Sequence, residues 1–272
     1  MENTESRYLR FGGIRVHFSV SMPEGAVRER ALLVCSPLIT EFHWRKLIPE
    51  LTQQGCVAVA AELPGFGDSD CGQAIPQDRD TRSNILWGIL DRLDEEMRAP
   101  MSMWHLIGHG SACRTVLRMA KMYPDSVRSQ VLLSPLFRAE QPADALELFD
   151  EIVRTPDTFR EAAEHLAAHP MDDYVLDRMR HPLLRRGAGE SFARMLRHLK
   201  GAPDEGMGFA PTMVIWGGAD PLMTDTALDD IDAMLPEAEK HVLRTAGYFP
   251  METHSMALRD YLRGWLRYNR QG

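Results

Sequence analysis

Short runs of apolar and β-branched residues recur along the chain and alternate with longer amphipathic stretches. The strand-like runs are 14–20, 31–36, 56–63, 103–108, 130–134, 212–217 and 240–245. Several are apolar almost throughout, which is typical of strands covered on both faces in a parallel sheet. Helix-like stretches lie between them at 44–54, 81–98, 111–122, 226–234 and 253–268. This alternation predicts an α/β fold with an open, mostly parallel sheet and helices on both faces. The first two runs, 14–20 and 31–36, together with Gly12-Gly13, predict a leading hairpin.

Residues 139–208 break this alternation, because they contain no strand candidate. The region consists of amphipathic helical segments punctuated by prolines, and a Gly/Pro/Asp-rich stretch at 201–208 ends it. Ligands of open α/β sheets bind at the carboxyl ends of the strands, so a helical insertion there predicts a lid over a pocket. We expect a core domain formed by 1–138 and 209–272 and a helical cap formed by 139–208. The alternative is a helical extension that covers no ligand.

Composition narrows the classes of function. The chain has 272 residues, of which 44% are hydrophobic and 26% charged, enough for a sizeable core with an internal pocket. No apolar run approaches the ~20 residues of a membrane span, and the start of the chain lacks a secretory pattern. A net charge of −8 argues against nucleic acid as a partner, and the four cysteines show no zinc-type spacing. We expect a cytoplasmic protein with a small-molecule ligand and no metal, cofactor, nucleic acid or membrane partner. A homodimer is left open.

The segment 103–120 carries the most specific chemical pattern. An apolar strand runs into Gly-His-Gly-Ser-Ala and then into a helix, and small residues lie two positions before and two after Gly110. This spacing is that of a nucleophile elbow, a tight strand-to-helix turn in which larger flanking side chains would collide with the backbone. Ser111 has His109 and Cys113 at the flanking positions, and both are too bulky. The pattern therefore predicts Gly110 at the tip of the turn.

With this pattern the chain resembles the α/β-hydrolase superfamily, in the branch of lidded esterases, C–C hydrolases and haloalkane dehalogenases. Four further segments are similar to family segments, in order: FHWRKLIPEL (42–51), AELPGFGDSD (61–70), VIWGGADPLM (214–223) and AGYFPMETH (246–254). They correspond to the helix after the third strand, the loop after the fourth, the segment of the triad acid and that of the triad histidine. The resemblance implies the α/β-hydrolase fold over nearly the whole chain, and it places Asp220 and Tyr248 at the acid and histidine positions.

Three positions depart from that family pattern. Gly110 stands where the family carries a Ser, Asp or Cys nucleophile, and Tyr248 stands where it carries histidine. Counting back from Trp44 places Pro37 where a backbone N–H helps to hold the oxyanion, and proline has no N–H. A glycine cannot attack a carbonyl, and a phenol with a pKa near 10 is a poor base at neutral pH. These departures argue against ordinary covalent hydrolysis.

The remaining groups predict a binding site. A helix that starts at Ser111 would turn free amides and its positive dipole end toward the pocket floor. Gly110 would leave room for a ligand atom, Asp220 would orient the Tyr248 hydroxyl, and His43 would lie at the pocket mouth. The candidate catalytic residues are Asp220 and Tyr248, and the candidate ligand-binding residues are Pro37, His43, Gly110 and Ser111.

Three functions follow from these residues. In the first, the protein binds a small apolar molecule with a carbonyl or carboxyl group and acts without hydrolysis, by binding alone or by non-covalent proton transfer, elimination or cyclisation. In the second, it is an ester or thioester hydrolase that uses Ser111 or a water activated through Asp220. In the third, it is a degenerate hydrolase that serves as a protein-interaction module, which predicts a filled pocket and an exposed apolar patch.

Overall fold

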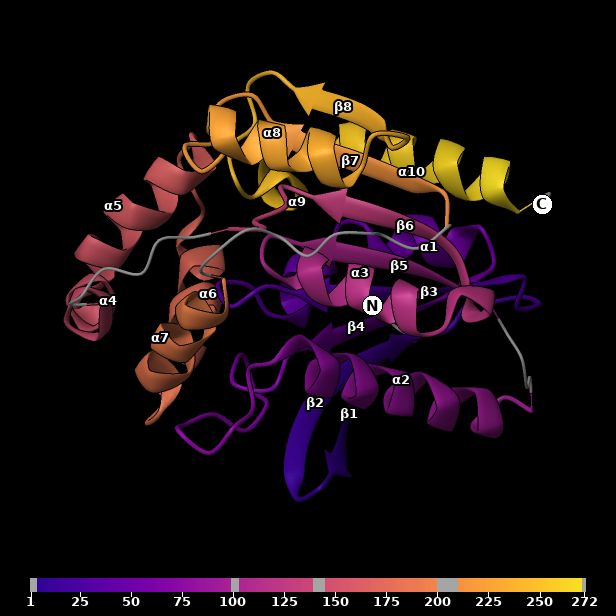
Figure 1. Cartoon of the computed structure of the whole chain (residues 1–272), viewed down its shortest axis with the longest axis horizontal. Helices are drawn as coiled ribbons and strands as arrows, with labels where there is room; N and C mark the ends of the chain where they lie inside the picture. Colours follow the sequence, from indigo (N-terminus) through magenta and orange to yellow (C-terminus); the bar gives the residue numbers. More distant parts are fainter. Residues whose placement is uncertain (1–3, 99–102, 139–144, 200–209, 271–272) are drawn as a thin grey trace.

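The structure is a computed structural model that describes residues 4–98, 103–138, 145–199 and 210–270. Eight strands form one sheet in the order β1-β2-β4-β3-β5-β6-β7-β8 (Figure 1). They are β1 (Thr4–Phe11), β2 (Ile14–Ser21), β3 (Glu29–Cys35), β4 (Cys56–Glu62), β5 (Trp104–His109), β6 (Val127–Leu133), β7 (Thr212–Gly217) and β8 (Glu239–Leu243). Strands β3 to β8 pair in parallel, whereas β2 pairs antiparallel with both β1 and β4. The expected mostly parallel sheet is confirmed.

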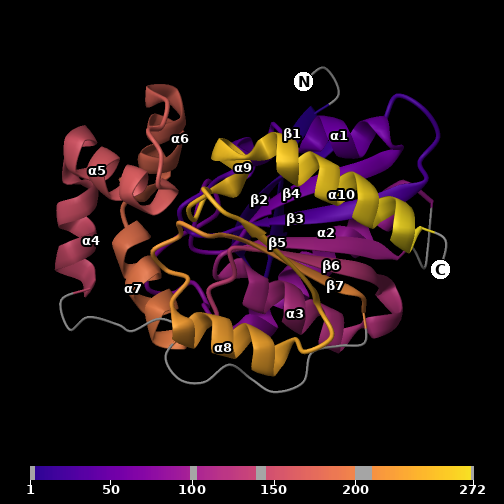
Figure 2. The same ribbon diagram turned by 90° about the horizontal axis from the view of Figure 1, so that it is seen from above.

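Helices cover both faces of the sheet (Figure 2). One face carries α1 (Ile48–Gln53), α9 (Pro250–Thr253) and α10 (Ser255–Asn269), and the other carries α2 (Arg79–Glu96), α3 (Ala112–Met122) and α8 (Asp225–Met234). Side chains of β4 alternate between two apolar cores: Ala58 and Ala60 join the first, and Val57 and Val59 join the second. Burial on both faces explains why these strands are apolar throughout.

Two expected elements differ from the structure at their boundaries. A leading hairpin forms around Gly12-Gly13, but it joins β2 to β1, which was not among the apolar runs, and the runs 14–20 and 31–36 do not pair with each other. This strand lies at the sheet edge with much of its side-chain surface exposed, so its sequence is largely polar. The expected helix 44–54 is shortened to α1, whose first turn contains Pro49, and a short 3₁₀ helix, η1 (Glu41–Trp44), precedes it. A second short 3₁₀ helix, η2 (Pro124–Ser126), precedes β6.

In the described part of the chain, four helices lie between β6 and β7 and stand beside the carboxyl ends of the strands (Figures 1 and 2). They are α4 (Ala145–Arg154), α5 (Pro156–Ala167), α6 (Asp173–Leu183) and α7 (Ala188–His198), and we refer to them as the cap. The cap contacts the core through hydrogen bonds. The Tyr248 amide donates to the Leu166 carbonyl at 2.7 Å, and the Gly72 amide donates to Ser191 Oγ at 2.9 Å. The Gly/Pro/Asp-rich stretch 201–208 lies outside the described residues.

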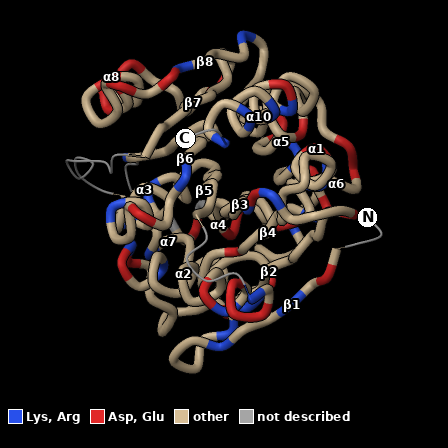
Figure 3. Tube along the Cα trace, turned by 90° about the vertical axis from the view of Figure 1, so that its right-hand side faces the viewer, with Lys and Arg blue, Asp and Glu red and all other residues tan. Residues whose placement is uncertain are grey.

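Charged residues of both signs are spread along the chain (Figure 3), and the cysteines do not form disulfides. Acidic and basic residues are interspersed along the chain trace (Figure 3). Within the described residues, none of the helices combines the length and apolarity needed to cross a membrane. The four cysteines are free thiols, and Cys35, Cys56 and Cys113 are buried.

Candidate functional site

A cavity of about 590 Å³ lies at the carboxyl ends of the strands, between the core and the cap. Pro37 and Ser111 line it from the loops after β3 and β5, and Tyr248 lines it from the loop after β8. Leu166 of α5 and Phe192 of α7 close it from the cap side. The structure therefore brings Pro37, Ser111 and Tyr248 together around one space.

Gly110 lies at the tip of the strand-to-helix turn. Its φ of +56° falls in the left-handed region, and Ser111, which follows it, already has helical angles of −67° and −20°. A Cβ at Gly108 would lie 2.9 Å from Val116 Cγ2 and 3.1 Å from Cys113 Cα, so the backbone tolerates only a small residue there. The close packing of helix α3 against β5 is thus the physical reason for the spacing seen in the sequence.

The side chain of Tyr248 fills the space above Gly110. A Cβ added to Gly110 would overlap the Tyr248 hydroxyl, and it would lie 2.8 Å from Tyr248 Cζ and 3.2 Å from Ser36 Cβ. Tyr248 is 3% exposed, and Gly110 is not among the residues that line the cavity. The open approach to bare backbone expected at Gly110 is therefore wrong, because the phenol occupies it.

The Tyr248 phenol also occupies the start of helix α3. Burial raises its pKa far above the usual range, and the nearby Asp220 charge raises the pKa further. The Ser36 hydroxyl and the Ser111 amide both interact with the phenol and act to lower that pKa. The net pKa is raised, so the phenol stays protonated, with its oxygen against the Ser111 amide. That amide is therefore not free, contrary to the expectation from sequence.

The His109 ring contacts both Tyr248 and Ser36 through its two nitrogens. Its Nε2 lies 2.7 Å from the Tyr248 carbonyl oxygen, so Nε2 carries the proton and donates. Its Nδ1 lies 2.8 Å from Ser36 Oγ, and burial lowers the pKa of the imidazole to about 4. The ring is therefore neutral near pH 7, and the Ser36 hydroxyl donates to Nδ1. Both nitrogens are engaged, so His109 is not available as a base for Ser111.

Asp220 lies beside the cavity rather than in its lining, which includes the next residues, Pro221 and Leu222. Its Oδ1 accepts a hydrogen bond of 2.9 Å from the Leu222 amide. Burial raises the pKa of Asp220 to about 6, against the opposing effects of that amide and of the Ser134 hydroxyl. Ser134 is close enough to affect this carboxyl electrostatically, but no standard hydrogen bond joins the two groups.

Unpartnered oxygens gather around this site. Ser111 Oγ, Ser134 Oγ and Asp220 Oδ2 are buried and have no hydrogen-bond partner among the described residues. Most buried polar atoms in proteins are hydrogen-bonded, so each of these three needs an explanation such as a ligand or a water. Sequence reasoning did not single out Ser134. Its signal is structural, since it has a φ of +41° directly after β6.

His43 does not lie at the pocket mouth, which corrects the expectation from sequence. It is fully buried, and the Thr40 amide donates to its Nδ1 at 2.9 Å. Burial lowers the pKa of this imidazole to about 4. His43 therefore helps to close the η1 turn and is not among the residues that line the cavity.

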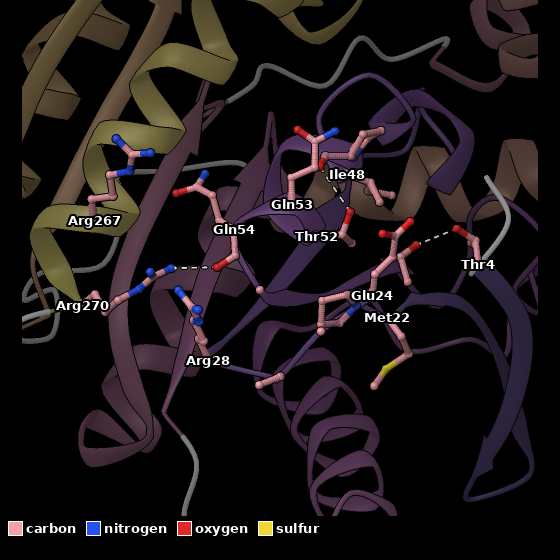
Figure 4. Close-up of a pocket in the computed structure, with 16 residues that line it drawn as sticks. Thr4, Met22, Glu24, Arg28, Ile48, Thr52, Gln53, Gln54, Arg267 and Arg270 are labelled. Atoms are coloured by element: carbon pink, nitrogen blue, oxygen red, sulfur yellow. Dashed lines mark hydrogen bonds between the residues drawn. The ribbon is translucent and has the colours of Figure 1, made fainter.

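Two other features of the molecule resemble binding sites. A more polar cavity of about 710 Å³ opens at the amino ends of β3 and β4, where Arg28, Arg267 and Arg270 converge (Figure 4). Arg270 donates to the Gln54 carbonyl at 3.1 Å and pairs with Glu29 at 3.2 Å. This cavity lies at the opposite end of the strands from the elbow, and none of the candidate residues lines it.

The second feature is a group of possible metal ligands formed by His17, Glu62 and Asp68. Glu62 Oε1 accepts from the Glu41 amide at 3.1 Å, and Oε2 accepts from the Asp68 amide at 2.6 Å. His17 Nδ1 lies 3.0 Å from Glu62 Oε2. Because both Glu62 oxygens already accept backbone amide hydrogen bonds, this carboxylate fits a structural role better than a metal ligand.

Comparisons with known proteins point to one family. A family model described as "Alpha/beta hydrolase family" matches residues 38–260. The 2-hydroxy-6-oxononadienedioate/2-hydroxy-6-oxononatrienedioate hydrolase of Cupriavidus pinatubonensis is 24% identical over 230 residues, which cover 79% of this chain and 78% of that protein.

Solved structures share the fold. The haloalkane dehalogenase DbeA from Bradyrhizobium elkani has a TM-score of 0.74 at 14% identity, over 99% of both chains. The epoxide hydrolase CorEH has a TM-score of 0.75 at 14% identity, over 97% of this chain and 99% of that one. The match of the family model, which spans most of the chain, shows that this protein belongs to the alpha/beta hydrolase family.

Proposed function

We propose that this protein binds a small, largely apolar molecule between core and cap and acts on it without covalent hydrolysis. The observation that carries the proposal is the Tyr248 hydroxyl, which occupies the space above Gly110 where a nucleophilic side chain would otherwise project. A covalent intermediate needs an attacking atom at that point, and neither a glycine nor a buried, protonated phenol supplies one.

The groups that would stabilise an oxyanion are also committed or missing. Pro37 has no N–H, and the Ser111 amide faces the Tyr248 oxygen. Removal of one oxyanion donor from a hydrolase costs about 10²- to 10³-fold in rate. This arrangement favours ligand binding, or a step that develops little oxyanion charge.

Two groups remain for a carbonyl or carboxyl group of the ligand. The Ser111 hydroxyl lines the cavity, has no partner and can donate to such an oxygen. Asp220, with its pKa raised to about 6, is the nearby group best suited to exchange a proton near neutral pH. Proton transfer, elimination or cyclisation would use this pair, whereas binding alone would need only Ser111.

The alternatives have less support. A protein-interaction module predicts a filled pocket, but a cavity of about 590 Å³ is present. A hydrolase that uses Ser111 needs a base for this hydroxyl, and no histidine among the described residues hydrogen-bonds to it. The curated relative is named for a dienedioate, which has two carboxylates. Arg138 lines the cavity here, but it is already paired with Asp230 at 2.5 Å.

The decisive experiment compares the wild type with the Gly110→Ser/Tyr248→His double variant on a panel of activated esters and thioesters. We expect no turnover and no acyl adduct in the wild type by intact-mass spectrometry. The double variant should form an adduct on residue 110, because the shorter imidazole vacates the space that a serine Cβ needs. The single Gly110→Ser variant is the control, since its Cβ overlaps the phenol.

Turnover by the wild-type protein that Ser111→Ala abolishes would refute the proposal. Native mass spectrometry of the freshly purified wild type complements this test, because a co-purified small molecule would identify the ligand directly.

A further inference from the structure

A second, smaller cavity lies within the cap. Its volume is about 170 Å³, and helices α4, α5, α6 and α7 supply most of its walls. Characteristic lining residues are Phe149, Val153, Phe159, Ala163, Met179 and Leu183. Every described residue that lines it is hydrophobic, so it offers a ligand no hydrogen-bond partner from a side chain. We call it the inner chamber.

The inner chamber adjoins the cavity at the elbow. Leu38, Leu166, Phe192 and Leu196 line both spaces. The walls of the two cavities differ in polarity, because Ser111 and Tyr248 line only the cavity at the elbow. Unfilled apolar space forfeits dispersion contacts, and protein interiors contain few voids of this size. The two cavities are therefore neighbours that share a wall of four apolar side chains, and the polar groups line the cavity on the elbow side.

We infer that the inner chamber receives the hydrocarbon tail of the ligand, while the ligand's single polar group stays beside Ser111 and Tyr248. This inference rests on the proposed function and specifies its ligand class: an elongated alcohol, acid or related compound with one polar end. A second polar group at the far end of the molecule would be buried without a partner, which is unfavourable. The chamber therefore selects against molecules that are polar at both ends.

The test uses the wild-type protein and isothermal titration calorimetry with 1-alkanols from 1-butanol to 1-decanol. Each added methylene should raise the affinity about fourfold until the chamber is full, after which the affinity should level off. The matched probe is 1,8-octanediol, which has the length of 1-octanol with a second hydroxyl. It should bind about tenfold more weakly than 1-octanol, or more weakly still. Octanoate then tests whether an acid is accepted at the polar end.

A variant locates the tail. Ala163→Phe on α5 fills the chamber, so it should weaken 1-octanol binding at least about tenfold and leave 1-butanol binding unchanged. Glu161→Phe places the same side chain on the exposed face of the same helix and should change neither affinity. Circular dichroism checks that both variants are folded. If Ala163→Phe does not fold, the alkanol series in the wild type still tests the inference.

The outcomes separate the inference from the proposed function. Affinities that do not depend on chain length, or a diol that binds as well as 1-octanol, would overturn the inference. If such binding occurred and Ser111→Trp abolished it, the ligand would bind in the cavity at the elbow but not in the inner chamber, and the proposed function would be retained. If no alkanol or acid bound and no ligand co-purified, both proposals would fail.

Discussion

Two buried polar clusters at the carboxyl edge of the sheet differ in how their atoms are satisfied. Around Glu62, at the end of β4, both carboxylate oxygens accept backbone amide hydrogen bonds, and His17 Nδ1 lies 3.0 Å from one of them without forming a hydrogen bond of its own within the described residues. Around Gly110, after β5, Ser111 Oγ and Asp220 Oδ2 have no partner in the part of the chain that the structure describes. Both clusters are largely buried, so burial alone does not distinguish them.

This difference distinguishes a cluster that supports the fold from one that can bind a ligand. A buried carboxylate whose two oxygens both accept hydrogen bonds holds its loops in place, whereas one with an unpartnered oxygen can accept from a ligand or a water. At the first cluster burial acts to lower the pKa of His17, but the Glu62 carboxylate outweighs it and the net pKa is raised. At the second cluster nothing outweighs burial, and the pKa of Asp220 rises to about 6.

The largest effect that we expect is a loss of stability when the Glu62 carboxylate is removed. Glu62→Ala leaves the Asp68 and Glu41 amides without an acceptor and removes the carboxylate that lies 3.0 Å from His17 Nδ1, so it should lower the free energy of unfolding by about 3–5 kcal/mol. Urea denaturation measures this loss. Glu147→Ala, at an exposed position on α4, should change stability by less than about 0.5 kcal/mol. A Glu62 variant as stable as this control would remove the distinction between the clusters.

At the cluster around Gly110 we expect the opposite effect, because there the buried carboxylate of Asp220 lowers the stability of the protein at neutral pH. The folded protein holds the Asp220 proton more tightly than the unfolded chain does, because its pKa rises from 3.8 to about 6. This contribution to stability is full below about pH 4 and is lost as the pH rises through 6. At pH 7–8 the burial of the charged carboxylate costs up to about 3 kcal/mol.

Asp220→Asn should therefore stabilise the protein at pH 8 and have little effect at pH 4, since the amide can still accept from Leu222. Urea unfolding at pH values from 4 to 8 measures the difference, and the exposed Asp229→Asn is the control. A variant that is destabilised at pH 8 would mean that the carboxylate has a favourable partner.

The smallest expected effect concerns the phenol. Tyr248→Phe removes a hydroxyl that interacts with the Ser36 hydroxyl and the Ser111 amide, so stability should fall by about 1 kcal/mol. Ligand affinity should change more than stability does, because the hydroxyl borders the cavity. Tyr268→Phe, at a position 79% exposed, is the matched control. A loss of several kcal/mol would place Tyr248 in the scaffold rather than in the site.

The sequence alone determined the sheet, its covering helices and the position of the elbow. Strands such as β4 are apolar on both faces because both faces are buried, and that pattern is local and readable. Gly110 was recognisable at the tip because a tight turn requires small neighbours two residues away, which is also a local constraint. The polar edge strand β1 was missed because its side chains are largely exposed and carry little apolar signal.

Only the tertiary structure decided what surrounds Gly110. Tyr248, Ser36 and His109 come from three separate loops or strand ends, and their contacts depend on how those ends converge rather than on any spacing in the sequence. His43 turned inward for the same reason, because the packing of η1 sets its direction. Periodicity fixes which face of an element is buried, but the partner of a buried polar atom is fixed by packing between distant segments.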